Sequence, residues 1–209
     1  MRFVRWIKII MCVTGVVCVT GVTGCVSPMY DTARTYPGLT VGGGLAYQIV
    51  DHEGGDIDVK LSGIRPDISL TYAPTNWFSF VGRAGVLIQP DQLDEPFPFA
   101  GLGFKVSTPW ERFNLGIRAE VDLPRYASFA PMAGFSNSKG HEYLTLGFQT
   151  VLGYMPATFF VNMHPLPGTH IFAGAVWPQK DVGIPEACVG LGYTYTFSKK
   201  NKEDKTKTE

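Results

Sequence analysis

The residues of this chain that are best suited to catalysis are grouped around His141. Ser136 and Ser138 precede it in a polar stretch, and Glu142 follows it. A histidine can act as the general base for a serine hydroxyl that lies within hydrogen-bond distance, which is the chemistry of acyl transfer. A polar loop that meets a strand would have the same composition without any chemistry, and we favour that interpretation.

No other motif in the sequence indicates a reaction or a cofactor. His164 and His170 flank residues 165–168, and we expect them to satisfy the backbone of that turn rather than to bind a metal. We find no metal-binding motif, phosphate-binding loop, nucleophile elbow or Cys-x-x-Cys pair. The sequence therefore predicts neither a cofactor nor a metal site.

These residues must be positioned by β-strands, because period-two alternation dominates from residue 39 to Phe197. The clearest example is 113–123, where apolar side chains and polar or glycine residues alternate. Segments 141–154 and 188–197 repeat the pattern. Further strands are expected at about 39–50, 57–73, 77–88, 97–107 and within 157–177, with a bulge near residues 62–63.

Short and long connections alternate along the chain. We expect short ones at 73–76, 108–111 and either 155–158 or 165–168, and longer polar ones at 51–56, 89–96, 124–140 and 178–185. Tight turns at one end and longer loops at the other are the layout of an outer-membrane β-barrel. With both chain ends on one side the strand number must be even, and we predict eight.

The composition of the two strand faces favours a membrane barrel. One face is Leu, Val, Ile, Phe and Tyr, as lipid contact requires, whereas the other mixes glycines with charges of both signs. A barrel of about eight strands has an interior just wide enough for side chains to fill. We therefore predict an all-β fold, a closed antiparallel up-and-down membrane β-barrel. The alternative is a lipid-tethered periplasmic β-sandwich.

The charged residues of the polar face are expected inside this barrel. Buried charges persist only when they are paired, so an ion-pair network that closes the lumen is the expected arrangement, and a pore lining is the alternative. The predicted network comprises Arg65, Asp67, Arg83, Lys105, Arg118, Glu120 and Asp122. Aromatic residues gather near the strand ends, where interfacial girdles would lie, at Tyr72, Trp77, Phe78, Trp110, Tyr154, Trp177 and Phe197.

The end of the strand region resembles the C-terminal assembly signal of small outer-membrane barrels of the OmpA and OmpX type. The matching residues are Gly190, Tyr193, Tyr195 and Phe197. The resemblance implies an eight-stranded barrel inserted by the barrel assembly machinery. One departure is the lysine-rich tail 198–209, which follows the usual terminal Phe and which we expect to be disordered.

The N-terminus resembles a bacterial lipoprotein signal peptide. A basic segment and a short apolar run lead to Val22-Thr23-Gly24-Cys25, which is similar to a lipobox. The resemblance implies cleavage after residue 24, lipidation of Cys25 with palmitate among the acyl chains, and handling by the lipoprotein sorting machinery. Val26 is not the Asp associated with inner-membrane retention. We thus expect a signal peptide at 1–24, a lipidated N-terminus and linker at 25–38, and the barrel at 39–197.

The overall charge excludes some classes of partner. Lys+Arg and Asp+Glu balance at 18 each, so no net charge marks a nucleic-acid-binding protein. Only 17% of the residues are charged, which is low for a soluble domain. Once the signal peptide is removed and Cys25 is acylated, Cys188 has no disulfide partner.

Taken together, these features predict an outer-membrane lipoprotein with both termini in the periplasm and a structural or envelope-interaction role. Its expected partners are outer-membrane lipids. Acidic residues in two expected outer loops could hold divalent cations against lipopolysaccharide phosphates, although simple solvation is the favoured interpretation. They are Asp51, Glu53, Asp56, Asp91, Asp94 and Glu95. The alternative functions are a lipid A-modifying enzyme with His141 at the outer rim, and a narrow pore.

Overall fold

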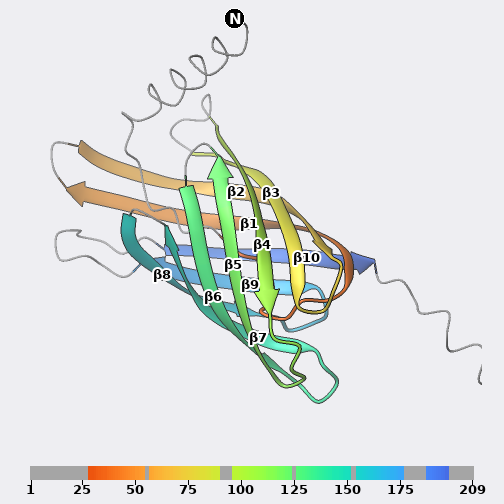
Figure 1. The fold of residues 1–209 in the computed structure, drawn as a ribbon. Helices are drawn as coiled ribbons and strands as arrows, with labels where there is room; N and C mark the ends of the chain where they lie inside the picture. Colours follow the sequence, from red (N-terminus) through yellow and green to blue (C-terminus); the bar gives the residue numbers. More distant parts are fainter. Residues whose placement is uncertain are drawn as a thin grey trace, which may run out of the picture.

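The chain forms a closed ten-stranded β-barrel in the computed structural model, which describes residues 28–54, 57–89, 96–123, 126–151, 154–176 and 187–197 (Figure 1). Each strand pairs antiparallel with its neighbours in sequence, and β1 closes the barrel on β10. The described strands are β1 (Gly38–Gly54), β2 (Ile57–Ala73), β3 (Phe78–Leu87), β4 (Phe97–Ser107), β5 (Phe113–Leu123), β6 (Tyr126–Ser136), β7 (Glu142–Val151), β8 (Tyr154–Met163), β9 (Thr169–Val176) and β10 (Ala187–Phe197).

The predicted fold class is confirmed, and the alternative β-sandwich is wrong. Within the described ranges, no helix is long and apolar enough to cross a membrane. The strand number differs from the prediction of eight, for two reasons. The expected loop 124–140 contains β6, and the single strand expected within 157–177 is two strands, β8 and β9.

The missed strands show only weak alternation because their inner faces carry apolar side chains among the polar ones. In β6, Ala130 and Met132 face inward and are buried, while Phe129 faces outward. In β8 and β9 the inward residues Phe160 and Phe172 are equally apolar and buried. When apolar residues stand on both faces of a strand, the period of two is weakened and the sequence looks irregular.

The extra strand β6 changes which end of the barrel carries His141. The connections 74–77, 108–112, 137–141 and 164–168 lie at the end where β1 begins and β10 finishes, which we call the terminal end. We had expected residues 124–140 to form a loop at the opposite end. Because β6 crosses the barrel, the turn that holds Ser138 and His141 lies at the terminal end instead.

The β-bulges of the barrel do not lie where the sequence predicts one. The pairing of β1 with β2 runs unbroken from Gly38↔Ala73 to Gly54↔Ile57, so the predicted bulge near residues 62–63 is wrong. The first irregularity lies between β6 and β7, where Phe135 pairs with Leu144 but Ser136 pairs with Glu142. Tyr143 is the extra residue of this bulge. A second shift lies at Thr150/Val151 between β7 and β8.

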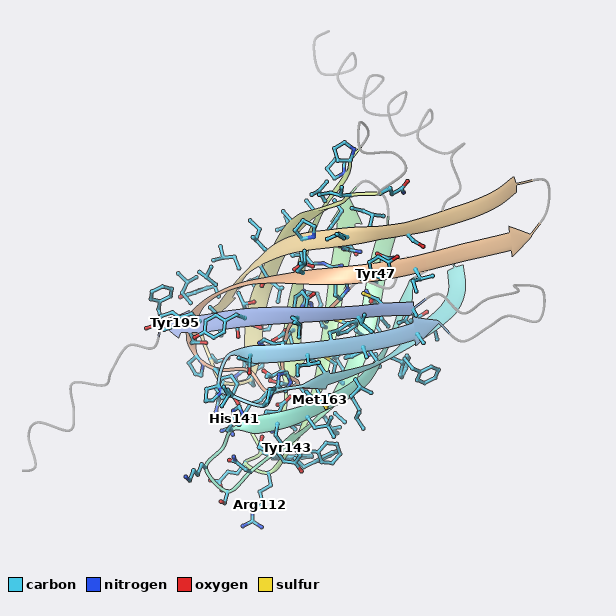
Figure 2. All side chains as sticks on the ribbon, turned by 180° about the vertical axis from the view of Figure 1, so that it is seen from behind. Tyr47, Arg112, His141, Tyr143, Met163 and Tyr195 are labelled. Atoms are coloured by element: carbon cyan, nitrogen blue, oxygen red, sulfur yellow. The ribbon has the colours of Figure 1, made fainter. Side chains whose placement is uncertain are left out.

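The two faces of the barrel differ sharply in composition (Figure 2). Every described strand has at least one large apolar side chain exposed on the outer face, from Leu45 at 54% to Leu102 at 71% and Leu191 at 64%. The predicted charged residues that the structure describes as buried lie on the inner face. The apolar face therefore points outward and the polar face into the lumen, as the alternation predicts.

The lumen is not empty, because the segment 28–37 lies in it up to Thr35, and the exposed residues 36 and 37 lead to β1. Met29, Tyr30, Ala33 and Thr35 are between 0% and 7% exposed. The segment enters β1 at Gly38, and its contacts reach β4, β5, β7, β8 and β10. We call it the luminal segment. The sequence had indicated only a linker here, since the segment has no periodicity.

Candidate functional site

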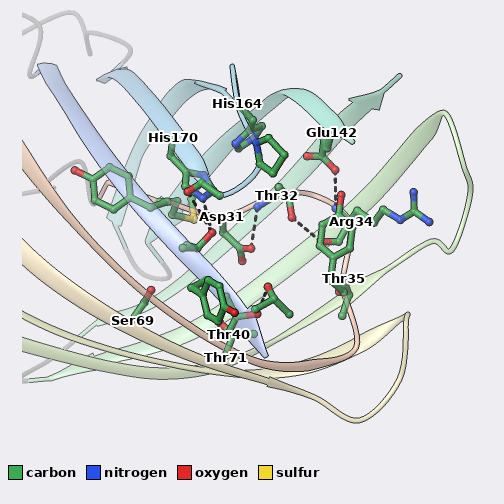
Figure 3. Close-up of a pocket in the computed structure, with 18 of the residues that line it drawn as sticks. Asp31, Thr32, Arg34, Thr35, Thr40, Ser69, Thr71, Glu142, His164 and His170 are labelled. Atoms are coloured by element: carbon green, nitrogen blue, oxygen red, sulfur yellow. Dashed lines mark hydrogen bonds between the residues drawn. The ribbon is translucent and has the colours of Figure 1, made fainter. Parts of the chain in front are cut away.

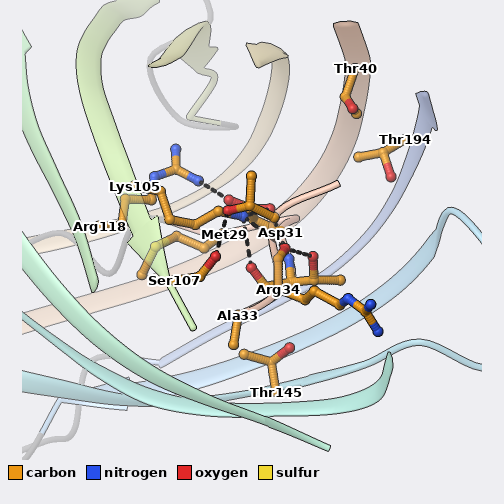
Figure 4. A network of polar contacts seen from close by, with 12 residues as sticks. Met29, Asp31, Ala33, Arg34, Thr40, Lys105, Ser107, Arg118, Thr145 and Thr194 are labelled. Carbon is orange, nitrogen blue, oxygen red and sulfur yellow. Dashed lines mark hydrogen bonds and ion pairs between the residues drawn. The ribbon is translucent and has the colours of Figure 1, made fainter. Parts of the chain in front are cut away.

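Asp31 of the luminal segment is the centre of the polar network inside the barrel (Figure 4). Its Oδ1 accepts a hydrogen bond from Lys105 Nζ at 2.8 Å, and its Oδ2 accepts one from Arg118 Nη1 at 3.2 Å. Lys105 also donates to the carbonyl oxygens of Thr32 and Arg34, at 2.9 and 3.2 Å. Two cations of the barrel wall thus hold one carboxylate of the N-terminal segment.

The structure places the seven predicted luminal charges on the inner wall, and six of them are 8% exposed or less. Arg83 pairs with Glu120 at 3.3 Å and with Asp122 at 2.9 Å. Arg118 pairs with Glu120 as well as with Asp31. The seven are four cations and three carboxylates, so the set on its own carries one excess positive charge, and Asp31 supplies the fourth carboxylate.

The two remaining members of the predicted set, Arg65 and Asp67, lie on β2. The Arg65 guanidinium stacks over the Phe99 ring, with 3.7 Å between its carbon and the ring centroid. Asp67 is 8% exposed and lines the cavity beside the luminal segment. A cation–π contact of this kind stabilises a guanidinium group that is buried away from water.

Glu142 is the second anchor of the luminal segment. Its two carboxylate oxygens accept hydrogen bonds from the backbone N–H groups of Ala33 and Arg34, at 2.7 and 2.9 Å. The bulge at Tyr143 makes this possible, because the extra residue re-aims Glu142 into the lumen while Tyr143 and Leu144 both face outward. Gly134 on β6 leaves room for this carboxylate, since a Cβ there would meet it.

Two further contacts fix the segment to the barrel wall. Asn162 Nδ2 on β8 donates to the carbonyl oxygens of both Met29 and Asp31, each at 2.9 Å. The Ser107 hydroxyl on β4 donates to Thr35 Oγ1 at 2.7 Å. The segment is therefore held on several sides of the barrel and is a part of the core.

Glycines of β1 and β10 leave the space that the Tyr30 side chain occupies. A Cβ at Gly44, Gly190 or Gly192 would overlap that ring. The sequence predicts that the glycines of the polar face lie inside a narrow lumen. The structure gives a different physical reason: the barrel is wider, and at these positions the missing side chains make room for the luminal segment. Tyr30 also contacts Phe172 edge-on, with ring centroids 6.4 Å apart.

A cavity of about 590 Å³ remains beside the luminal segment (Figure 3). Much of its wall on the β1, β2 and β10 side is hydroxyl side chains, and its lining reaches the terminal end of the barrel. The hydroxyl residues are Thr40, Ser69, Thr71, Thr194 and Thr196. Thr40 and Thr196 hydrogen-bond to each other at 2.8 Å.

The residues predicted as a possible acid–base group do not come together. His141 Nε2 lies 2.9 Å from the backbone carbonyl of His164, and the Ser136 hydroxyl accepts a hydrogen bond from Asn114 at 3.4 Å. Ser138 is exposed in the turn. Across the described ranges, no group of three or more His, Cys, Asp or Glu residues could hold a metal ion.

His164 has a structural role at the turn after β8. The Thr145 hydroxyl donates to Glu142, so its oxygen accepts from His164 Nε2, which lies 2.8 Å away and must carry the proton. Burial, with the neighbouring His170 ring as a second cause, lowers the pKa of His164 to about 3. The imidazole is therefore neutral at pH 7, and its hydrogen bond to the Thr145 hydroxyl ties the turn after β8 to β7.

The remaining predicted residues lie on the outer face or outside the described ranges. Tyr193, Tyr195 and Phe197 on β10 point outward with 55–56% exposure, whereas Gly190 faces the Tyr30 ring. Asp51 and Glu53 belong to β1 rather than to a loop. Residues 1–27 with Cys25, the segment 177–186, the tail 198–209 and the acidic positions 56, 91, 94 and 95 lie outside the described residues.

Sequence reasoning missed Tyr30, Asp31 and Asn162. No periodic signal marks the luminal segment, because it is neither strand nor helix. A partial signal existed in the charges: the predicted inner set has four cations and three carboxylates, so at least one further carboxylate is needed to balance it.

Comparisons with known proteins return only structural likeness. No family and no curated protein matches the sequence. The solved structures include Neisserial surface protein A, at 14% identity and a TM-score of 0.37, covering 76% of this chain and 97% of that one. They also include Ail, the attachment invasion locus protein of Yersinia pestis, solved with the heparin analogue sucrose octasulfate. It matches at 15% identity and a TM-score of 0.35, covering 77% of this chain and 100% of that one. Both are small outer-membrane β-barrels.

Proposed function

We propose that this protein is an outer-membrane lipoprotein whose barrel is closed by its own N-terminal segment and serves a structural or envelope-interaction role. The observation that carries the proposal is the outer face. Large apolar side chains are exposed on every described strand, and 30 of them lie on the described strands.

An aqueous location does not account for that face. Apolar residues scattered singly over a soluble surface are normal, but a continuous apolar area far beyond a few hundred Å² marks a membrane or a partner. A closed barrel satisfies its backbone hydrogen bonds between strands and can cross a bilayer without an edge. Exposed Tyr72, Trp77, Trp110 and Phe197 at the terminal end fit an interfacial girdle.

The occupied lumen favours a closed barrel over a pore. The luminal segment fills part of the interior, and paired side chains such as Arg83 and Asp122 span another part. Such a barrel can anchor loops or a lipidated terminus rigidly in the membrane without conducting. The arrangement of His141, which has no serine hydroxyl among the partners found in the described residues, gives no support to lipid A modification.

The lipoprotein part of the proposal concerns residues outside the described ranges. It comprises cleavage after residue 24, lipidation of Cys25, periplasmic termini and use of the lipoprotein sorting machinery. Its support is the lipobox-like sequence that precedes Cys25. Recognition of Phe197 and its neighbours by the barrel assembly machinery, and contact of the loops with lipopolysaccharide, are further parts of the same proposal.

Two measurements test it. Isolated outer membranes are run on a gel with and without boiling and blotted for the protein; a mobility shift on heating is expected for a folded membrane barrel. Metabolic labelling with radioactive palmitate should mark the wild type and not a Cys25→Ser variant. A protein that stays in the soluble fraction with no heat shift would overturn the barrel proposal. Equal labelling of both chains would overturn lipidation at Cys25 alone.

A further inference from the structure

Five hydroxyl side chains form one continuous wall of the luminal cavity, on the inner face of the adjacent strands β2, β1 and β10. Thr40 pairs with Thr71 on β2 and with Thr196 on β10, which makes one row across the three strands. In the next row inward from the terminal end, Gly42 pairs with Ser69 and Thr194. We call these hydroxyl residues the hydroxyl wall; they are Thr40, Ser69, Thr71, Thr194 and Thr196.

Much of the hydrogen-bonding capacity of the hydroxyl wall is unused within the described part of the chain. Ser69 and Thr71 have no hydrogen-bond partner among the described residues, although both are half-buried. Thr40 and Thr196 share one hydrogen bond, so one of their two hydroxyl protons stays available. Because a hydroxyl group both donates and accepts, the wall offers donors and acceptors to whatever occupies the cavity.

Asp67 continues the wall one inward-facing position beyond Ser69, where it pairs with Gly44. It lines the same cavity, and its Oδ2 is buried without a hydrogen-bond partner in the ranges that the structure describes. A buried acceptor without a donor is costly, so the site favours an occupant that can donate. Arg65 precedes Asp67 on the inner face of β2, and Arg83 pairs with Ser69 from β3. These two cations disfavour a positively charged occupant, which leaves a neutral hydroxyl as the better donor.

The luminal segment forms the other side of the cavity. Figure 3 shows Thr40 and Thr71 on the lower side, with Asp31 of the luminal segment above them. The Tyr30 ring lines the inner end, next to the glycines of β1 and β10. Residues of the turns after β6 and β8 line the outer end, so the cavity can be reached from the terminal end of the barrel.

We propose that this cavity binds a neutral saccharide of one or two pyranose rings, which enters from the terminal end. The sugar hydroxyls exchange hydrogen bonds with the hydroxyl wall, and one of them donates to the carboxylate of Asp67. An apolar ligand would leave the same groups unpaired. The volume of about 590 Å³ suits such a ligand, because small-molecule sites occupy about 300–1,000 Å³. The inference goes beyond the proposed function and does not depend on which side of the membrane the terminal end faces.

The test is saturation-transfer NMR on the folded full-length protein, titrated in turn with glucose, galactose, cellobiose and maltose. The protein is kept in an amine-oxide detergent, because the sugar head group of a glycoside detergent would compete for the site. We expect saturable binding of at least one of these sugars and none of triethylene glycol, a polyether with few hydroxyl groups. No saturable binding of any of the four sugars, or equal binding of triethylene glycol, would overturn the proposal.

Two matched double variants locate the site. Ser69→Ala/Thr71→Val removes two hydroxyls of the wall and should weaken binding about tenfold, because each net hydrogen bond is worth a factor of about two to ten. Ser128→Ala/Thr158→Val removes the same two groups from buried inner positions of β6 and β8 that do not line the cavity, and it should leave the affinity unchanged. An equal loss of affinity in the two double variants would refute the hydroxyl wall as the binding surface.

Asp67→Asn tests the carboxylate, because the change keeps the shape of the side chain and removes its charge. Hydrogen bonds to charged groups are the stronger ones, so the affinity should fall about tenfold. Unchanged affinity in a folded Asp67→Asn barrel contradicts the site. The heat shift on gels is scored for every variant, and if Asp67→Asn does not fold, the two double variants decide. A wild-type barrel that shows the heat shift and binds no sugar refutes this cavity site and leaves the membrane barrel standing.

Discussion

Replacement of Asp31 by asparagine tests whether the luminal segment belongs to the core of the barrel. The change keeps the shape of the side chain and removes the charge that faces Lys105 and Arg118, whose side chains are only 2% and 5% exposed. Removing one partner of a buried ion pair costs about 3–5 kcal/mol, because the other charge stays buried without compensation. Lys105 keeps the carbonyls of Thr32 and Arg34, and Arg118 keeps Glu120, so we expect a loss near 3 kcal/mol.

The assay is urea unfolding of the barrel in detergent micelles or vesicles, followed by intrinsic tryptophan fluorescence. The double variant Asp31→Asn/Lys105→Met places two neutral side chains together and should regain much of the lost stability. The expected coupling energy between the two sites is about 1–3 kcal/mol. Glu111→Gln, which changes an exposed carboxylate in the turn 108–112, is the matched control and should change stability by less than about 0.5 kcal/mol. A similarly small loss for Asp31→Asn, or strictly additive single variants, would refute the assignment of Asp31 as the centre of the network.

Three further results are expected. Gly192→Val places side-chain atoms where the Tyr30 ring lies, so the luminal segment should become accessible to protease at a stability cost of about 1–3 kcal/mol. Gly82→Val, whose Cβ would have the flexible Leu102 side chain as its nearest neighbour at 3.3 Å, should leave the segment protected. His141→Ala should leave the lipid A profile unchanged by mass spectrometry, and an altered profile would restore the enzymatic alternative. The pKa of His164 is lowered by burial to about 3, so the unfolded chain binds a proton below about pH 6.5 that the folded chain does not. The free energy of unfolding should therefore fall by at most about 2 kcal/mol from pH 7 to pH 5. The His164→Asn variant should lose this contribution to the pH dependence of stability. If the variant has the same pH profile as the wild type, His164 is not a buried neutral imidazole.

The strands that could be predicted are those whose two faces differ. Residues 113–123 and 188–197 alternate between apolar and polar or glycine side chains, and they form β5 and β10. β6, β8 and β9 could not be read in the same way, because Met132, Phe160 and Phe172 face an interior that is itself apolar there. Their inner residues pack in one cluster with Met29 and Tyr30 of the luminal segment.

The candidate site shows the same division. The charges on the wall could be assigned to the lumen from their alternation with apolar residues, and the structure buries Arg83, Lys105 and Arg118 together. Their partner Asp31 could not be found, since residues 28–37 form neither strand nor helix and leave no periodic pattern. The inward turn of Glu142 could not be found either, because it depends on a bulge that pairing with β6 imposes.

The amino-acid sequence by itself determined that the chain folds into a closed all-β barrel with an apolar exterior and a charged interior. Strand alternation is local, and it records directly which side of each strand meets lipid or lumen. The tertiary structure decided the number of strands, the end of the barrel at which His141 lies, and the occupant of the lumen. Those features arise from contacts between residues far apart in the chain, as between Asp31 and Arg118 or Ala33 and Glu142, which no local pattern encodes.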